Sequence, residues 1–405
     1  MNSIAANQAR VFWQLFTELS ASFRTDRNLP GRIQKRLASE RRFGSRDRRL
    51  YRELLYTSLR YLPWVEQLQA RPEAEAWEAI VWLAAPIPAL RALKEQLPAQ
   101  FAGAEQSVGA KAKILGVSAS LLPEWFVHEC PGATGTPEID VLHTRSPLWL
   151  RLQTDAPQAV LGEFESRGWS WRQLPAFPDA VELLGDVDVT QTEAFLAGKI
   201  EVQDLGSQLV LQAVAPSPGS HWLDACAGAG GKTLQLARAL GPQGSVAAHD
   251  IRPAALEELQ QRARRASLRN VTIQTNPSGQ FDGVLVDAPC SGSGTWRRSP
   301  HLKWCTSASD VTNAAELQKT LLARFATFVK PGGTLVYATC SLCRSEDAAV
   351  VESFLAGHAD FSVDDLAHSA AAARFGLDRQ STGLTVWPST HNTDGFFVSV
   401  LRRAG

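Results

Sequence analysis

Residues 223–240 read LDACAGAGGKTLQLARAL, which is an apolar segment, a glycine-rich turn and a segment whose apolar residues have helical spacing. Gly228, Gly230 and Gly231 allow the backbone to adopt positive φ and to approach a ligand closely. The order strand, glycine loop, helix predicts the first unit of an α/β sheet with a ligand at the loop.

The sequence on both sides of this stretch repeats the alternation of apolar strand and amphipathic helix. Such alternation predicts a mostly parallel sheet with helices on both faces and with ligands outside the carboxyl ends of the strands. The expected strands are 221–228 (HWLDACAG), 244–250 (GSVAAHD), 271–275 (VTIQT), 281–289 (FDGVLVDAP), 332–340 (GGTLVYATC) and 394–403 (DGFFVSVLRR).

The glycine loop excludes two common phosphate-binding motifs. Cys226 stands where a P-loop needs its first glycine, and Thr233 stands where a dinucleotide fingerprint needs its third. S-adenosylmethionine, which carries a cation and no phosphate, suits an acidic residue at the strand end, Asp224, beside an open turn. Asp250, at the end of the next strand, is placed to contact ribose hydroxyls. A tight turn without a ligand is the structural alternative.

The N-terminal half of the chain has a different pattern. Residues 5–130 carry apolar side chains at helical spacings, CPGATGTPE at 130–138 is typical of a linker, and residues 145–205 alternate short strands with a helix. We therefore expect three domains, 1–135, 140–205 and 206–405.

Composition narrows the class of protein. With 41 basic and 41 acidic residues the net charge is zero, although 32–52 carry nine basic residues against Glu40 and Asp47, a local charge of +7. That segment is either a solvated helix face or a surface that contacts phosphates. The sequence suggests neither a signal peptide nor a membrane span, and six dispersed cysteines fit reduced thiols, so a cytoplasmic protein is expected.

Cysteines follow two of the expected strands. Cys340 and Cys343 form a Cys-x-x-Cys pair, but no second pair exists to complete a structural zinc site, and a redox pair belongs to a smaller thioredoxin-like sheet. No metal is expected. Cys226 and Cys130 are interpreted as buried packing residues, and Cys305 has no assigned role.

A thiolate beside a methyl donor has one coherent use. Carbon 5 of a pyrimidine is a poor nucleophile until a thiolate adds to carbon 6, and the adduct must later lose the carbon 5 proton to release the thiolate. An acid that protonates N3 helps the first step, and Asp287 lies close to Cys290 in the sequence. One cysteine would attack and the second would help to break the adduct.

Four stretches together identify a family resemblance. DACAGAGGKT, DAPCSGSGTWRRSP, VKPGGTLVYATCS and DGFFV, in this order, resemble the RNA cytosine-5 methyltransferases of the Sun/Fmu type, over about residues 145–405. The resemblance implies a Rossmann-like S-adenosylmethionine-dependent methyltransferase domain after a small α+β RNA-recognition-like module. The helical N-terminal domain is similar to the NusB-like RNA-binding domain of the bacterial 16S ribosomal RNA (RsmB-like) enzymes in domain order and length.

In that family the Thr-Cys cysteine is the nucleophile, which implies that Cys340 attacks and Cys290 releases the product, with Asp287 near the target base. The implied cofactor contacts are Asp224, Cys226, Ala227, Gly228, Ala229, Gly230, Gly231, Lys232, Asp250, Asn276 and Asp287. Arg297, Arg298, Lys303 and Trp304 are implied to line the path of the RNA.

Two positions depart from the family pattern. Asn276 stands where an aspartate usually contacts adenine, and Ala229 stands where the cofactor loop usually has proline. We expect a monomeric enzyme that forms 5-methylcytosine in RNA, with 16S ribosomal RNA as the substrate and transfer RNA as the alternative. The alternative from another class is a non-catalytic RNA-binding or ribosome assembly factor.

Overall fold

The structure is a computed structural model that describes residues 3–101 and 107–405. The chain divides into two compact units. The helical unit comprises Met1–Arg145 and Thr295–Ala308, and the α/β unit comprises Ser146–Gly294 and Ser309–Gly405. Segment 295–308, which the sequence pattern did not separate from the strands around it, therefore packs with the helical unit.

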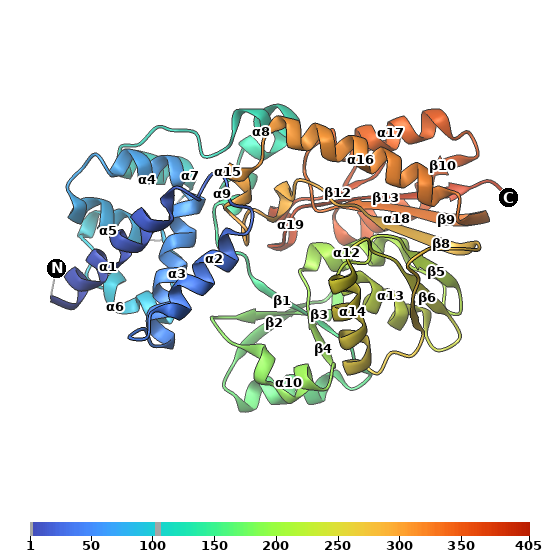
Figure 1. The fold of residues 1–405 in the computed structure, drawn as a ribbon, viewed down its shortest axis with the longest axis horizontal. Helices are drawn as coiled ribbons and strands as arrows, with labels where there is room; N and C mark the ends of the chain where they lie inside the picture. The colour runs from blue at the N-terminus through green and yellow to red at the C-terminus, as the bar shows by residue number, and fades with distance from the viewer. Residues whose placement is uncertain (1–2, 102–106) are drawn as a thin grey trace. The chain divides into compact units, whose positions relative to one another are not determined.

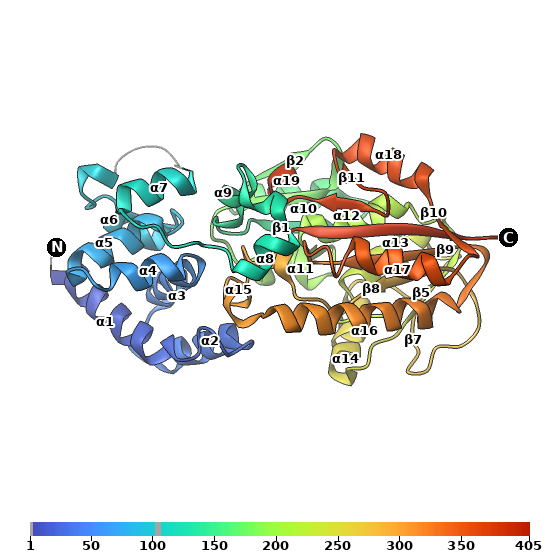
Figure 2. The same cartoon turned by 90° about the horizontal axis from the view of Figure 1, so that it is seen from above.

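Amphipathic helices form the helical unit because their apolar positions recur at three- and four-residue intervals. Leu15, Leu54, Trp64, Trp77 and Ile80 are fully buried in its core. The helices are α1 Ser3–Ser20, α2 Leu29–Ser39, α3 Ser45–Arg60, α4 Leu62–Leu68, α5 Glu73–Leu83, α6 Arg91–Lys94, α7 Val108–Leu115, α8 Glu124–Glu129, α9 Glu138–Leu142 and α15 Leu302–Cys305 (Figures 1 and 2).

Residues 148–202 form the small α+β module of the α/β unit. It consists of β1 Leu148–Leu152, α10 Pro157–Ser166, β2 Ser170–Leu174, β3 Phe177–Leu184, α11 Glu193–Leu196 and β4 Ile200–Val202. The strands form an antiparallel sheet in the order β2-β3-β1-β4, which is the β-α-β-β-α-β arrangement of ferredoxin-like and RNA-recognition modules.

Both faces of this small sheet are covered. Leu150, Leu152 and Val181 pack with Phe164 of α10 on one face. On the other face, Trp149 belongs to the core of the larger sheet and its indole N–H donates to the Asn392 carbonyl at 3.0 Å. The face on which an RNA-recognition module stacks bases is therefore turned inward here.

The larger sheet has the strand order β11-β12-β13-β9-β8-β5-β6-β7, and β10 pairs with β13. Its parallel part is β5 His221–Asp224, β6 Ser245–Ala248, β7 Val271–Ile273, β8 Phe281–Asp287 and β9 Val329–Thr339. Its antiparallel part is β10 Phe361–Val363, β11 Asp378–Arg379, β12 Leu384–Val386 and β13 Phe396–Arg403. The six expected strands are present, and the sheet is mixed because β10, β11 and β12 extend it around β13.

Helices cover both faces of this sheet, as the sequence predicted (Figure 1). They are α12 Leu205–Val214, α13 Gly231–Leu240, α14 Pro253–Arg265, α16 Ala308–Ala326, α17 Ala348–Gly357, α18 Asp365–Phe375 and α19 Pro388–His391. In β8, Val284 and Val286 join the core beneath α16 and α17, while Leu285 joins the core beneath α12, α13 and α18. Residues 283–286 of this strand are all buried and carry no polar side chain, because both faces of the sheet are covered there.

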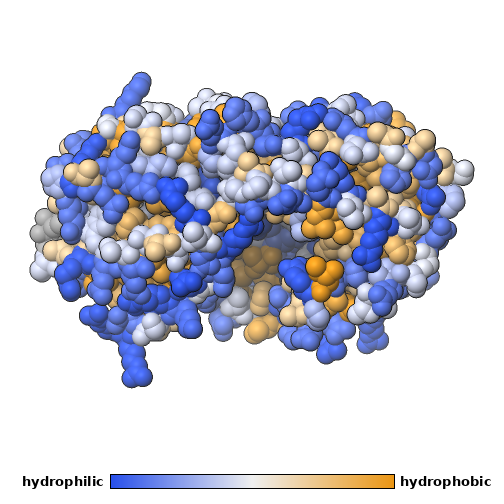
Figure 3. Space-filling view, turned by 45° about the horizontal axis from the view of Figure 1, so that its top comes forward, coloured by the Kyte–Doolittle hydropathy of each residue, from blue (hydrophilic) through white to orange (hydrophobic). Residues whose placement is uncertain are grey.

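The surface contrasts with these cores. Hydrophilic side chains predominate on the face drawn in Figure 3, with hydrophobic ones scattered among them. Among the helices within residues 3–101 and 107–405, none is both long enough and apolar enough to span a membrane.

Candidate active site

The candidate active site lies at the carboxyl ends of the parallel strands β5, β6, β8 and β9. Asp224 ends β5, Asp250 follows β6, Asp287 ends β8 and Cys340 follows β9. Because these strands are parallel neighbours, their ends meet at one edge of the sheet. The sheet order thus places at one edge side chains that are far apart in the sequence, such as Asp224 and Cys340, which are 116 residues apart.

The glycine loop between β5 and α13 depends on glycine at two positions. Gly228 and Gly230 have φ of 53° and 90°, which side-chain-bearing residues rarely adopt. A Cβ on Gly230 would also lie 2.7 Å from Leu259, so α14 packs against the bare backbone. The loop therefore forms the glycine-dependent turn that the sequence predicted, and its contact with a ligand stays a prediction.

Asp224 is buried beneath this loop, with 1% of its surface exposed. Its Oδ2 accepts a hydrogen bond of 2.6 Å from the Thr233 hydroxyl, while its Oδ1 has no hydrogen-bond partner within the described part of the chain. Burial raises the pKa of Asp224 to about 7, although the Thr233 hydroxyl opposes this shift. An unpaired buried carboxylate oxygen needs a donor, and the ammonium group of S-adenosylmethionine is such a donor.

Asp250 supports the loop from the second strand. It accepts the Gly228 N–H at 2.9 Å and forms an ion pair of 2.9 Å with Arg252. Burial alone would raise the pKa of Asp250, but the hydrogen bonds from Arg252 and Gly228 hold it below its usual value. The side chain is therefore an ionised acceptor, suited to ribose hydroxyls. Asn276, the expected adenine contact, is exposed beyond β7.

The two cysteines that the sequence singled out are neighbours in space. The Sγ atoms of Cys290 and Cys340 are 3.4 Å apart. The contact with Cys340, together with burial, raises the pKa of Cys290 well above its usual value. The two sulfurs are within hydrogen-bonding distance of each other, and either one can be the donor.

Asp287 and Lys232 form the third element of the site. Lys232 Nζ donates to Asp287 Oδ2 at 2.8 Å and lies 5.1 Å from the ring centre of Phe396. The lysine is 8% exposed and the aspartate 29%. A buried ammonium and a partly open carboxylate thus stand at the same strand ends as the two cysteines.

Glu346 is a residue of the site that the sequence reasoning missed. It is fully buried. Its carboxylate accepts the Ser291 N–H at 2.7 Å and the Ser341 hydroxyl at 2.6 Å, and it also accepts the Ser291 hydroxyl. Because Ser291 follows Cys290 and Ser341 follows Cys340, one carboxylate bridges both cysteine loops. The signal in the sequence was a pair of adjacent acids, Glu346 and Asp347, whose roles local patterns cannot assign.

The remaining cysteines of the α/β unit have packing environments. Cys343 is buried, with its Sγ 3.4 Å from the Ser293 hydroxyl. Burial raises the pKa of both Cys343 and Cys226. Within residues 3–101 and 107–405, no cluster of three or more His, Cys, Asp or Glu side chains is arranged to hold a metal ion.

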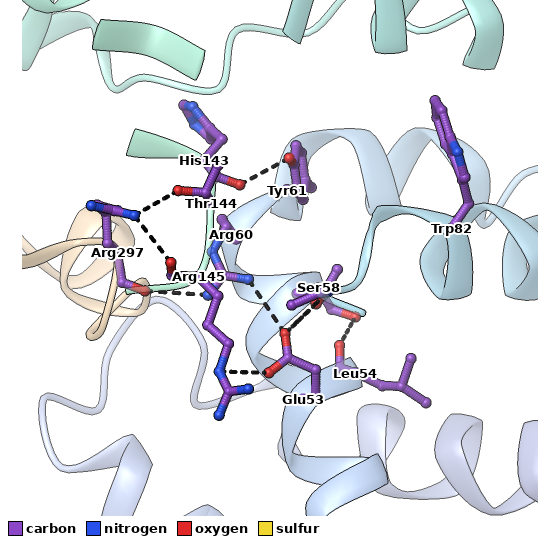
Figure 4. Close-up of polar contacts among 12 residues, drawn as sticks. Glu53, Leu54, Ser58, Arg60, Tyr61, Trp82, His143, Thr144, Arg145 and Arg297 are labelled. Atoms are coloured by element: carbon purple, nitrogen blue, oxygen red, sulfur yellow. Dashed lines mark hydrogen bonds and ion pairs between the residues drawn. The ribbon is translucent and has the colours of Figure 1, made fainter. Parts of the chain in front are cut away.

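Of the four residues expected to line the RNA path, only Arg298 is exposed. Arg297 donates to the Thr144 hydroxyl at 2.9 Å and to the Arg145 carbonyl at 3.1 Å, near the ion pairs of Glu53 with Arg60 and Arg145 (Figure 4).

Lys303 and Trp304 are likewise committed within the helical unit. Lys303 is 2% exposed and donates to the Arg60 carbonyl at 2.9 Å, and burial lowers its pKa well below the usual value. The Trp304 indole N–H donates to the Leu59 carbonyl at 2.6 Å. Arg297, Lys303 and Trp304 thus have packing roles, and direct RNA contact by any of the four stays a prediction.

The fold and the site first define a class of protein. A Rossmann-like methyltransferase has a parallel sheet with a glycine loop after its first strand and an antiparallel strand beside the last parallel one, and this chain has both features. It also has a buried acid with one unpaired oxygen beneath the loop. A methyltransferase homologue from Pyrococcus horikoshii, a solved structure, is 25% identical with a TM-score of 0.60 and covers 74% of this chain and 100% of its own. The solved structure of PH0851 shares the fold at 21% identity, with a TM-score of 0.71 over 91% of this chain and 93% of its own.

The sequence comparisons then give the family. The family model described as 16S rRNA methyltransferase RsmB/F matches residues 211–402. Ribosomal RNA small subunit methyltransferase B of Erwinia tasmaniensis is 30% identical over 408 residues, which cover 90% of this chain and 92% of the relative. The protein of the same name from Shewanella oneidensis is 36% identical over 278 residues, which cover 65% of this chain but only 61% of the relative. The chain belongs to the RsmB/F family of 16S ribosomal RNA methyltransferases.

Family membership confirms three of the expectations from the sequence. The Sun/Fmu-type resemblance, the Rossmann-like fold and S-adenosylmethionine as the cofactor are those of this methyltransferase family. The position of the methyl group on the base and the roles of individual residues go beyond the family assignment.

Proposed function

We propose that this chain transfers a methyl group from S-adenosylmethionine to carbon 5 of a cytosine in 16S ribosomal RNA, through a covalent bond between Cys340 and carbon 6. The 3.4 Å separation of the Cys290 and Cys340 sulfurs carries this proposal. A methyltransferase that acts on oxygen or nitrogen needs no thiolate, whereas the pyrimidine carbon 5 reaction needs one nucleophile and a way to release it.

The glycine loop would hold the cofactor. Asp224 Oδ1 is the acceptor for its ammonium group, the backbone of Gly228–Lys232 lies along it, and Asp250 accepts from its ribose hydroxyls. Asn276 would contact the adenine only at an exposed position, so we assign it a weak role. When bound, S-adenosylmethionine supplies an electrophilic methyl group.

The first step is the attack of Cys340. Its thiolate forms a bond to carbon 6 of the cytosine, and the electrons of the 5,6 double bond move to carbon 5, which takes the methyl group. In this proposal the Cys290 thiol, whose sulfur lies 3.4 Å away, donates to the attacking Cys340 thiolate. Asp287 contacts the N3 edge of the base, and the buried Lys232 ammonium beside it compensates the negative charge that the ring gains.

The second step restores the enzyme. The carbon 5 proton leaves to a base, its bonding electrons reform the 5,6 double bond, and the sulfur–carbon 6 bond breaks with its electron pair returning to Cys340. Cys290 assists this step because its sulfur is next to the leaving sulfur. The cytosine must be unpaired or flipped out of its helix so that its carbon 6 face meets the thiolate.

The choice of RNA rests on the relatives' names and on the charge of α2 and α3. These helices and the turn between them carry exposed cations, which are Lys35, Arg41, Arg46, Arg48 and Arg52. Three other arginines of the same segment are paired with acids, namely Arg32, Arg36 and Arg42. The exposed set is suited to phosphates, so we assign the helical unit to RNA binding. A monomeric enzyme in the cytoplasm completes the proposal.

Trapping the covalent intermediate tests the chemistry and the substrate together. Cys290→Ala protein, incubated with S-adenosylmethionine and total cellular RNA, should retain RNA that survives denaturing gels, and its sequence should map to one cytosine of 16S ribosomal RNA. The Cys290→Ala/Cys340→Ala protein is the control and should retain none. An adduct on transfer RNA would show that transfer RNA, and not 16S ribosomal RNA, is the substrate. Cofactor binding without an adduct on any RNA or ribosomal particle would favour a non-catalytic assembly factor.

Salt dependence tests the RNA surface. Arg41→Glu/Arg48→Glu should weaken RNA binding a few-fold and reduce the slope of log affinity against log salt by about 2, because each lost phosphate contact reduces that slope by about 1. Arg41→Lys/Arg48→Lys keeps the charge and should keep the slope. An unchanged slope in Arg41→Glu/Arg48→Glu would show that α2 and α3 are a solvated surface that does not contact phosphates.

A further inference from the structure

The inward face of the small α+β module ends at the cofactor loop. Three polar side chains from this face are buried: Arg151 of β1, Glu201 of β4, and Gln203, which follows β4. Arg151 Nε donates to Gln203 Oε1 at 2.6 Å, and another nitrogen of its guanidinium lies 3.4 Å from the Gly231 carbonyl, at the first residue of α13. Polar groups at this depth need a reason, since apolar residues would pack the same interface at lower cost.

Glu201 shows what these groups hold. Its carboxylate, 2% exposed, accepts from Arg262 at 2.8 Å and from Arg265 at 2.5 Å, both on the last turn of α14. Arg262 also donates to the Ala229 carbonyl at 2.7 Å. The connection thus runs from the module through a buried carboxylate and one guanidinium to the backbone at the centre of the glycine loop.

The loop needs such a support because of its own sequence. Ala229 stands between Gly228 and Gly230, which both have positive φ, so the residues on each side of it offer little conformational restriction. A backbone carbonyl fixed by a charged donor removes this freedom at the middle residue. Arg265 shares Glu201 but stacks on Phe195 at 4.2 Å, and the structure gives it no bond to the loop.

We propose that Arg262, oriented by Glu201, is a positioning residue of the cofactor loop and that the small module acts through this pair to hold the loop in its binding conformation. The sheet face with which an RNA-recognition module contacts bases here supports the cofactor loop. This inference rests on the proposed function for the identity of the ligand, but the support of the loop is a property of the chain alone.

The test compares Arg262→Gln with Arg265→Gln, which removes the other partner of the same carboxylate. Arg262→Gln should weaken S-adenosylhomocysteine binding in calorimetry about tenfold, the usual effect of losing one charge-assisted hydrogen bond, and should raise KM for S-adenosylmethionine with kcat at saturation unchanged. Hydrogen exchange at 228–232, measured without ligand, should be about tenfold faster. Arg265→Gln should leave the ligand affinity and this exchange as in the wild type.

A second variant separates positioning from general stability. Ala229→Pro fixes the backbone of the loop covalently, so Arg262→Gln/Ala229→Pro should regain most of the lost affinity. Equal effects of Arg262→Gln and Arg265→Gln, or unchanged exchange at the loop in Arg262→Gln, would overturn the inference. Wild-type protein that binds no S-adenosylhomocysteine would overturn the cofactor assignment instead, and the exchange comparison would still decide whether Arg262 holds the loop.

Discussion

The cysteine loops and the glycine loop lie at the same edge of one sheet but are held differently. Glu346 bridges both cysteine loops with one fully buried carboxylate, which accepts from a backbone N–H and from two hydroxyls. The glycine loop is held at its carbonyls by Arg262 and Arg151, donors that come from another helix and from the small module.

The difference follows from what each loop must do. Two sulfurs that act in successive steps of one reaction need a fixed separation, which a short, shared anchor provides. A loop that binds and releases a cofactor needs a preferred conformation but not a fixed one. Long arginine side chains that hold its carbonyls provide such a conformation. The cysteine loops should therefore respond to substitution through chemistry, and the glycine loop through affinity.

The largest effect is expected at the nucleophile. Cys340→Ala should abolish methyl transfer and leave S-adenosylhomocysteine affinity unchanged, because the cysteine contributes chemistry and no part of the glycine loop. Methylation assays and calorimetry on the same preparation measure both quantities. Undiminished transfer in Cys340→Ala would remove the nucleophile assignment.

Glu346→Ala is expected to be next in size. It leaves the Ser291 N–H buried without an acceptor and removes the shared acceptor of two hydroxyls. This should cost about 2–4 kcal/mol of unfolding free energy in urea and lower kcat about 100-fold as the sulfurs move apart. Glu346→Gln should lose less of both. Glu352→Ala, which removes a half-exposed carboxylate from the same helix region, is the control and should change neither. Wild-type kcat in Glu346→Ala would show that the cysteine loops hold themselves.

The smallest effect is expected at Asp224 and depends on pH. Its folded-state pKa of about 7 lies above that of an unfolded aspartate, so the folded chain binds the extra proton between about pH 4 and 7. The wild type should therefore lose stability relative to Asp224→Asn as pH rises toward 7. Ligand affinity should run the opposite way and increase about tenfold from pH 6 to 8, because the ammonium group prefers the ionised carboxylate. Calorimetry with S-adenosylhomocysteine at both pH values measures this affinity. Equal affinity at both pH values in the wild type would show that Asp224 does not bind the ammonium group.

Local patterns in the sequence predicted the strands, the glycine turn and the positions of Cys290 and Cys340 after two strands, because each depends on residues adjacent in the chain. The roles of these residues stay predictions. Buried strands such as β8 read as apolar runs, and the site residues follow them directly. Sheet order then brought Cys290 and Cys340 together without further information from the sequence.

Residues whose roles depend on distant partners could not be found in this way. Glu346 acquires its role through a contact with Ser291, 55 residues away, and Arg262 through a contact with the Ala229 carbonyl, 33 residues away. Arg297 and Lys303 read as RNA ligands because they are cationic, yet folding commits them to carbonyls of the helical unit. Spacing alone does not reveal which cations stay exposed.

Placement of segment 295–308 in the helical unit has a consequence for synthesis of the chain. The first 145 residues leave the ribosome long before this segment, and the intervening 149 residues take roughly 10–30 s to make at bacterial rates. During that time Phe126 lacks the ring of Trp296, which it later meets at 4.4 Å, and Leu59 lacks the indole of Trp304. Until segment 295–308 has been synthesised, the nascent helical unit therefore exposes apolar surface that chaperones can bind.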